Sequence, residues 1–233
     1  SFRFFYYNFV ISNLYVCMTK EEMTNVDYEN LVNSILSIMM KKGILSTTMD
    51  QLASTLRISK RTLYEIFISK DNLVGEVLRA YTEYHTSNQI KIAEKASNII
   101  EAMLKIFIFS RDILSEINLD FYRDMEQFYT QIKDFEVTSI PYNSHLLELI
   151  KEGISKGYVR TDIDYLLLFR LMLIQMNFLK QMDKAFPRDI TMFDVYDTIC
   201  LGFMRGITSP DGMKILDKLL TEHPELVRKP QLV

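Results

Sequence analysis

Apolar residues recur at the spacing of an α-helix along most of the chain. Between residues 28 and 39 the apolar positions are Tyr28, Leu31, Val32, Ile35, Leu36 and Met39. Intervals of three and four residues place them on one face of a helix. Lys41, Lys42 and Gly43 follow, as the basic last turn and glycine stop of a helix C-terminus would. We therefore expect a first helix that ends near Gly43.

Polar residues that cap helices predict three more helices after this one. Thr48 stands three residues before Gln51, the spacing of a capping box at a helix start. Ser59 can cap a helix from Lys60 to about residue 67, and Ser69 can cap a fourth helix that begins at residue 70 or 71. The second and third of these helices are short.

The rest of the chain is divided by breaks in the helical pattern. Glycine, proline and small polar residues gather near 97–98, 118, 138–144, 157–164, 185–191 and 207–212. Between them we find no alternating run of strand length, no repeat and no low-complexity stretch. The pattern predicts an all-α protein of about nine or ten helices.

Composition and charge limit the possible functions. The chain has 233 residues, of which 48% are hydrophobic and 24% charged, and its net charge is −3. These are values of an ordinary globular protein, and an acidic total means that any DNA contact must come from a local basic patch. Cys17 and Cys200 fit no metal or redox spacing, so we expect a reducing, cytoplasmic location.

The first eighteen residues are mostly apolar and aromatic. This segment can be interpreted in two ways. A secretory signal is one, but Asn8 and Asn13 interrupt the apolar run and no small-residue cleavage site follows. The run is also shorter than the ~20 residues of a membrane span. We favour an N-terminal extension over residues 1–26, which an upstream start site would explain.

The segment 47–70, TTMDQLASTLRISKRTLYEIFISK, carries the chemistry. Two helices this short need a third to cover their apolar faces, and the helix at 28–39 can do so. This is the helix-turn-helix arrangement, in which the last helix enters the major groove of DNA. With Leu63 and Phe67 turned to the core, Lys60, Arg61, Tyr64 and Glu65 face outward.

The outward residues suit contacts with bases and phosphates. Lysine and arginine donate to guanine, hydroxyls reach bases or phosphates, and helix starts attract phosphate. The candidate DNA-binding residues are Thr48, Arg57, Ser59, Lys60, Arg61, Thr62, Tyr64 and Lys70. The alternative is a helical hairpin inside a larger core, with the basic residues merely solvated.

This segment resembles the DNA-binding signature of the TetR (tetracycline-repressor-like) family, over about residues 27–75. The matching positions are Thr47, Thr48, Leu52, Ala53, Ile58, Ser59, Leu63, Tyr64, Phe67, Ser69, Lys70 and Leu73. Arg57 replaces the turn glycine of the pattern, and Ile66 replaces an aromatic residue or histidine. Arg57 makes a left-handed turn more costly but adds a cation, whereas Ile66 removes the phosphate contact that the resemblance implies there.

The resemblance implies a DNA-binding domain at 27–75 and a larger helical domain at 76–233 that dimerises and binds a ligand. The sequence supports dimerisation independently, since the predicted helix 163–182 is apolar almost all round and must be covered on every face. By resemblance, this helix and a second at about 192–205 pair with those of another subunit in a four-helix bundle. A central helix in a monomer is the alternative.

An aromatic and methionine-rich stretch gives tentative residues for a ligand pocket. They are Met103, Phe107, Phe121, Tyr122, Met125 and Phe128. Such a stretch can line an apolar cavity for a small apolar effector, or it can simply be core. His85, His145 and His223 are isolated, and no nucleophile or phosphate-loop motif occurs, so we expect neither an enzyme nor a metal or cofactor site.

The sequence thus predicts a homodimeric, ligand-responsive repressor that reads an operator with two recognition helices at residues 60–67. By resemblance, the effector would shift the helix that begins at Asp71. Two rivals stay open: an all-α interaction module of the same fold without DNA binding, which the acidic total charge favours, and a helical enzyme, which would need an acid–base pair.

Overall fold

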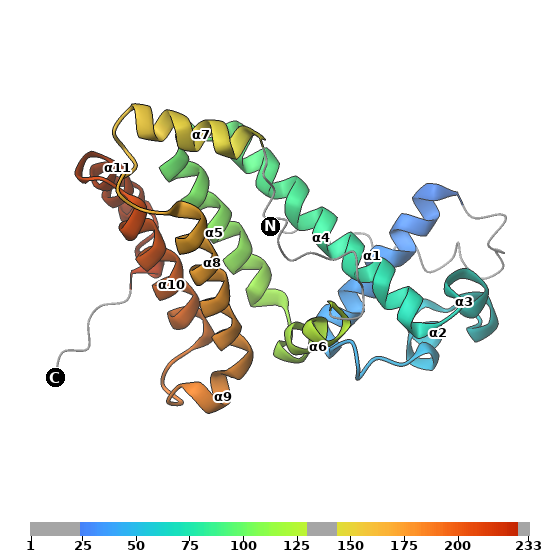
Figure 1. Ribbon diagram of the computed structural model, residues 1–233. Helices are drawn as coiled ribbons and strands as arrows, with labels where there is room; N and C mark the ends of the chain where they lie inside the picture. Colours follow the sequence, from blue (N-terminus) through green and yellow to red (C-terminus); the bar gives the residue numbers. More distant parts are fainter. Residues whose placement is uncertain (1–23, 130–143, 228–233) are drawn as a thin grey trace. The chain divides into compact units, whose positions relative to one another are not determined.

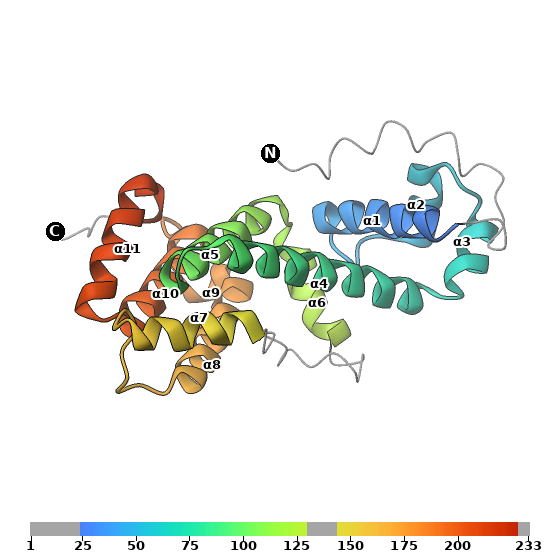
Figure 2. The same ribbon diagram turned by 90° about the horizontal axis from the view of Figure 1, so that it is seen from above.

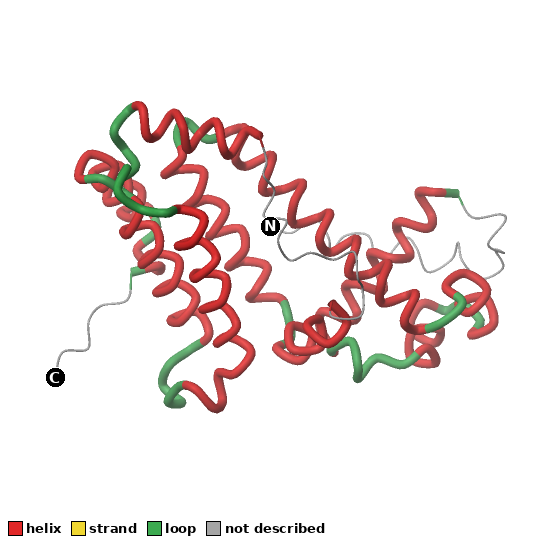
Figure 3. Tube along the Cα trace, viewed as in Figure 1, coloured by secondary structure: helices red, strands yellow, loops and turns green. Residues whose placement is uncertain are grey.

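The computed structural model describes residues 24–129 and 144–227 (Figure 1). Within these two ranges every element is helical, and the β-structure is an isolated antiparallel bridge between Val159 and Thr208 (Figure 3). The predicted all-α class is confirmed. Of the predicted extension over residues 1–26, residues 1–23 lie outside the described residues, and α1 already begins at Asn25. The predicted break at 138–144 also lies outside them, except that residue 144 begins a helix.

The helices begin and end close to the predicted signals. They are α1 (Asn25–Lys42), α2 (Met49–Leu56), α3 (Lys60–Phe67), α4 (Lys70–Lys95), α5 (Ile99–Glu116), α6 (Leu119–Tyr129), α7 (Ser144–Ser155), α8 (Tyr165–Met176), η3 (Asn177–Gln181), α9 (Met182–Ala185), α10 (Met192–Ile207), α11 (Pro210–Glu222) and η4 (Pro224–Leu226). Caps at Thr24, Thr48, Ser59, Thr191 and Ser209 each accept a hydrogen bond from the first turn of their helix. Local capping chemistry therefore sets where these helices start.

The chain forms two compact units. Among the described residues, the first comprises 24–84 and 116–129, and the second comprises 85–115 and 144–227. The helix-turn-helix unit therefore reaches nine residues past the predicted boundary at 75 and includes α6, a later helix of the sequence. The predicted domain limits stay a prediction.

The first unit is built on the apolar face predicted for α1. Leu31, Ile35 and Met39 are almost fully buried, as are Leu52 on α2 and Leu63 on α3. Figure 2 shows α1, α2 and α3 grouped beside the N-terminal part of α4. Burial of such a side chain contributes about 1.5–3 kcal/mol, which short helices such as α2 and α3 need to be stable.

The second unit packs α5, α7, α8, α10 and α11 around a common core. Phe203 on α10 is buried in this core, with edge-on ring contacts to Phe107 at 6.2 Å and Phe169 at 5.7 Å. At one end Gly212 admits no side chain, because a Cβ there would come within 2.1 Å of the Tyr158 carbonyl oxygen. The turn after α7 is thereby held against the start of α11.

The predicted continuous helix 163–182 is wrong. It begins at Tyr165, becomes a 3₁₀ helix at Asn177, and resumes as the short α9 at Met182. Asparagine and phenylalanine are weaker helix formers than the leucines before them, and 3₁₀ turns are frequent at helix ends. The tighter turn leaves Leu179 and Met182 buried.

Candidate nucleic-acid interface

The two ends of the helix-turn-helix are fixed by hydrogen bonds that the sequence predicts. Thr48 Oγ1 accepts from the Gln51 amide at 3.2 Å, and Gln51 Oε1 accepts from the Thr48 amide at 2.9 Å. Ser59 Oγ accepts from the Thr62 amide at 2.9 Å and lies 2.8 Å from the Thr62 hydroxyl. Thr48, Ser59 and Thr62 therefore hold the starts of α2 and α3.

The turn between α2 and α3 places a cation where the resemblance expects glycine. Arg57 adopts the left-handed conformation, with φ 55° and ψ 38°. The Arg57 amide donates to the Ser54 carbonyl at 3.3 Å, and the Ile58 amide donates to the Ala53 carbonyl at 3.0 Å. Both carbonyls lie near the end of α2. The Arg57 side chain is exposed, and among the described residues it forms no ion pair.

Helix α3, which the sequence predicts to be the recognition helix, has one buried and one exposed face. Leu63, Ile66 and Phe67 are buried, whereas Lys60 and Tyr64 are exposed. The predicted core and outward positions are thus confirmed. Ile66, which replaces the aromatic residue or histidine of the pattern, packs into the core.

Both cations of α3 are paired with carboxylates. Lys60 Nζ lies 2.7 Å from Asp50 Oδ1 on α2, and Arg61 Nε lies 2.7 Å from Glu65 Oε1 one turn later. These hydrogen bonds raise the pKa of Lys60 and of Arg61 further above neutral pH, where both side chains are already cationic. The pairing of Asp50 with Lys60 was not predicted, since a pair ten residues apart across a turn has no periodic signal.

Lys70 has a structural contact that was not predicted. Its ammonium donates to the Leu45 carbonyl at 3.2 Å, and its side chain is half-buried at the start of α4. The lysine therefore joins the turn before α2 to the helix after α3. A DNA contact by Lys70 stays a prediction.

The joint between α3 and α4 is strained. Ile68 has φ 65° and ψ −49°, and the Ser69 amide donates to the Phe67 carbonyl at 2.6 Å. This is a γ-turn of the rare, strained kind. The Ile68 side chain is 71% exposed, so packing does not offset the strain.

The six tentative pocket residues fall into both units. Met103 and Phe107 belong to the second unit, whereas Phe121, Tyr122, Met125 and Phe128 belong to the first. Phe121, Met125 and Phe128 are buried core of that first unit. A ligand pocket formed by these residues stays a prediction.

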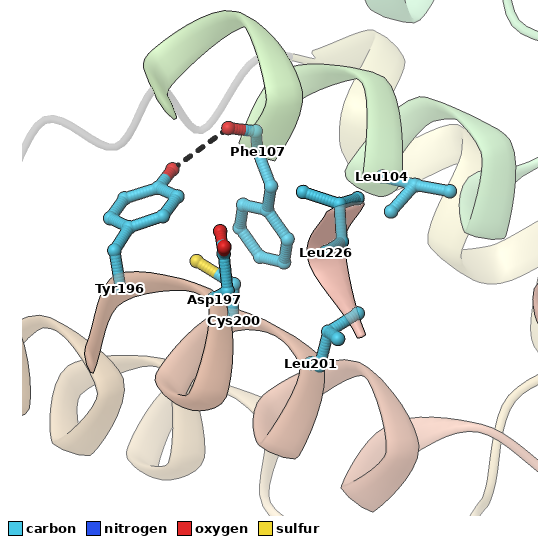
Figure 4. A pocket seen from close by; sticks show the side chains of 7 residues that line it. All are labelled: Leu104, Phe107, Tyr196, Asp197, Cys200, Leu201 and Leu226. Atoms are coloured by element: carbon cyan, nitrogen blue, oxygen red, sulfur yellow. Dashed lines mark hydrogen bonds between the residues drawn. The ribbon is translucent and has the colours of Figure 1, made fainter. Parts of the chain in front are cut away.

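A small cavity of the second unit lies between α5 and α10 (Figure 4). It is lined by Leu104, Phe107, Tyr196, Asp197, Cys200, Leu201 and Leu226. The Tyr196 hydroxyl donates to the Phe107 carbonyl at 2.9 Å, and Arg111 Nε lies 2.8 Å from Asp197 Oδ1. Burial raises the pKa of the Cys200 thiol to about 12, so this thiol is protonated and unreactive at neutral pH.

Other kinds of site find no support in the described ranges. Across residues 24–129 and 144–227, no group of three or more histidine, cysteine or acidic side chains is arranged to hold a metal ion. In the same ranges no helix has the length and apolar character needed to span a membrane.

The helix-turn-helix is the part of the chain that matches a known family profile. Residues 31–77 match the sequence profile of the family described as bacterial regulatory proteins, tetR family. This range contains the whole of α2 and α3, with most of α1 and the start of α4.

Two curated relatives and one solved structure extend the similarity beyond that range. The HTH-type transcriptional repressor KstR2 of Mycolicibacterium smegmatis (strain ATCC 700084 / mc(2)155) is 22% identical over 147 residues, 61% of this chain and 72% of the relative. The protein of that name from Mycobacterium tuberculosis (strain CDC 1551 / Oshkosh) is 23% identical over 145 residues, 60% of this chain and 72% of the relative.

The solved structure shares the fold. It is a transcriptional regulator of the TetR family from Agrobacterium tumefaciens, 10% identical, with a TM-score of 0.54 over 77% of this chain and 96% of that one. The helix-turn-helix and the helical region after it thus occur together in a known architecture.

Proposed function

We propose that this chain, as a transcriptional regulator of the TetR family, is a homodimeric repressor. It reads operator DNA with α3 and responds to a small effector. The exposed face of α3 carries the proposal. Lys60, Arg61 and Tyr64 stand on a short helix whose opposite side is fixed in the core. The similarity to curated repressors favours this function over an interaction module or an enzyme.

Two copies of α3 would enter successive major grooves of a near-palindromic operator, with half-sites about 10 bp apart. Lys60 and Arg61 supply donors for guanine O6 and N7, and Tyr64 supplies a hydroxyl for a base or phosphate. The capped starts of α2 and α3, at Thr48 and Ser59, are suited to phosphate. Arg57 adds a cation in the turn between them.

Removing the two recognition-helix cations tests this assignment. We expect Lys60→Ala with Arg61→Ala to weaken operator binding by at least tenfold, since each good base contact contributes ~1–3 kcal/mol. A matched control is Lys156→Ala with Lys214→Ala, which removes two exposed, ion-paired cations of the second unit. Circular dichroism would check that both variants keep their fold. Equal operator affinity for the two variants would show that α3 does not read DNA.

We propose that the dimer forms through α8 and α10. Leu167, Leu171, Ile174 and Phe178 are 56%, 46%, 61% and 47% exposed. Their intervals of four, three and four residues make one apolar stripe along α8 and into η3. The exposed face of the neighbouring α10 includes Gly202, whose lack of a side chain lets another helix approach closely.

A charge placed in this stripe tests the dimer. We expect Leu171→Glu with Ile174→Glu to yield a folded monomer by light scattering, because both side chains are exposed and the glutamates repel across a two-fold axis. Val26→Glu, at an exposed apolar position of α1, is the control. A double variant that stays dimeric would place the interface elsewhere.

The effector is proposed to be small and apolar and to bind the second unit. The cavity between α5 and α10 is apolar apart from Tyr196, Asp197 and Cys200, and it is too small for a ligand unless those helices separate. An effector can release DNA only by favouring the conformation that cannot bind it. Thermal shifts with apolar compounds, repeated with operator present, would identify effectors whose stabilisation the operator reduces.

A further inference from the structure

The C-terminal end of α1 is held by α6, a helix about 80 residues later in the sequence. The last carbonyls of any helix have no partner within that helix and need donors from elsewhere. Here the Asn118 amide donates to the Met40 carbonyl at 2.7 Å, and Asn118 Nδ2 donates to the Lys41 carbonyl at 3.2 Å. Asn118, the residue before α6, therefore caps α1 from outside.

The turn between α1 and α2 is held by the same helix. The Leu45 amide donates to Asp124 Oδ2 at 2.8 Å. Gly43 makes this approach possible, since a Cβ there would lie 3.2 Å from the Asp120 Cβ and 3.3 Å from Asp124 Oδ2. Gly43 also has φ 92°, which side-chain-bearing residues rarely adopt. The glycine is thus required by the helix stop and by the packing of α6.

The remaining carbonyls of this turn have their own donors. Ser46 donates to the Lys42 carbonyl, and Thr47 Oγ1 donates to the Gly43 carbonyl at 2.6 Å. The Lys70 ammonium, at the start of α4, donates to the Leu45 carbonyl. Phe121, fully buried on α6, anchors the helix beneath them and contacts the Tyr81 ring of α4 at 5.8 Å. These hydrogen bonds, together with those of Asn118 and Asp124, limit the freedom of the turn to rearrange.

We infer that Asn118 and Asp124 are positioning residues for DNA reading: from α6 they fix the turn that starts α2 and thereby the orientation of α2 and α3. Neither residue belongs to the helix-turn-helix or to its exposed face. The chain passes from the second unit to the first between residues 115 and 116, and Asn118 is the third residue after this point. The inference rests on the proposed function.

The test measures DNA discrimination and local opening in the same full-length variants. In Asn118→Ala with Asp124→Ala, we expect operator affinity to fall about tenfold, on the scale of one or two lost hydrogen bonds. Affinity for a scrambled duplex should stay within twofold, since phosphate contacts tolerate misorientation better than base contacts. Amide hydrogen exchange at Leu45 should accelerate at least tenfold.

Two single variants separate positioning from charge. Asp124→Asn keeps an oxygen that can accept from Leu45, so it should retain operator affinity within threefold. Asp112→Ala removes one carboxylate from an exposed site on α5 and should change neither affinity nor Leu45 exchange.

The inference is overturned if Leu45 exchange accelerates in the double variant while operator affinity is unchanged, or if exchange does not change at all. Equal weakening on both duplexes would also overturn it, since that is a loss of general affinity. If the wild-type protein itself fails to discriminate the operator, the proposed function has failed and this inference with it, a result visible without any variant.

Discussion

At the scale of single residues, the cations of the surface that we propose faces DNA are partly neutralised by neighbouring carboxylates. Asp50 holds Lys60 and is itself 69% exposed in the first turn of α2. A carboxylate near a helix start repels phosphate there while it adds no donor for bases. The arrangement should therefore weaken sequence-independent binding more than operator binding.

We accordingly predict that Asp50→Asn binds a scrambled duplex about three- to tenfold more tightly at low salt, because one repulsive charge is gone. Operator affinity should rise less, so that the ratio of operator affinity to scrambled-duplex affinity falls. Fluorescence anisotropy with both duplexes measures this ratio. An unchanged ratio would mean that Asp50 has no part in discrimination.

Ile68 combines a strained backbone with an exposed side chain, so replacing it with glycine should stabilise the protein. We predict that Ile68→Gly raises the free energy of unfolding by about 1 kcal/mol, because relief of the positive φ outweighs the entropy that glycine adds to the unfolded chain. Chemical denaturation measures the change. Ile68→Ala is the control: it removes the exposed side chain, keeps the strain, and should not stabilise.

His85 makes stability depend on pH. Burial lowers its pKa from 6.5 to about 4, so the folded protein keeps the ring neutral while the unfolded chain protonates it below pH 6.5. Its contribution to stability is complete above pH 6.5 and is lost as the pH falls towards 4. Between pH 7 and 5 we predict a loss of about 2 kcal/mol from this residue.

The measurement is denaturation of the wild type and of His85→Phe at both pH values. Phenylalanine cannot titrate and can keep the edge-on contact with Phe109. The variant should therefore lose less stability than the wild type on acidification. Equal losses would show that His85 does not titrate as described.

At the scale of elements, one ion pair joins α5 to α10 beside the cavity. Arg111 Nε donates to both Asp197 oxygens at 2.8 and 3.1 Å, and its guanidinium lies 4.8 Å from the centre of the Phe193 ring. Asp197 is buried, and burial raises its pKa although Arg111 opposes the shift. The carboxylate is stable in this place only with its partner.

We predict that Arg111→Leu lowers the free energy of unfolding by about 3 kcal/mol, since it leaves a buried carboxylate without a cation. Arg111→Leu with Asp197→Asn should recover part of this loss, and urea denaturation of the three proteins measures both values. If the double variant is no more stable than Arg111→Leu, the pair is not coupled as the structure indicates.

The sequence predicted elements where their signals are local. The caps Thr48 and Ser59 and the stop at Gly43 lie next to the helices they delimit, so α1, α2 and α3 could be placed to within a few residues. The change to 3₁₀ geometry at Asn177 was not predicted, because apolar composition continues through it. The contacts of Asn118 and Asp124 with the turn after α1 were not predicted either, since they join residues 77 to 79 positions apart.

At the scale of the whole molecule, we propose that one compact unit binds DNA and the other forms the dimer. The first presents α3, and the second presents the apolar stripe of α8. The net charge of −3 means that attraction to DNA must come from the helix-turn-helix surface and not from the protein as a whole. Binding without the correct bases should consequently be weak.

The central claim, that this protein reads a DNA sequence, is tested most directly by binding to the DNA that flanks its own gene. The purified protein is titrated against that duplex and a scrambled one over a series of salt concentrations. We predict preferential binding of the flanking duplex, with an affinity that falls steeply as salt rises. Equally weak binding to both duplexes would contradict the account and favour an interaction module that keeps the fold without reading DNA.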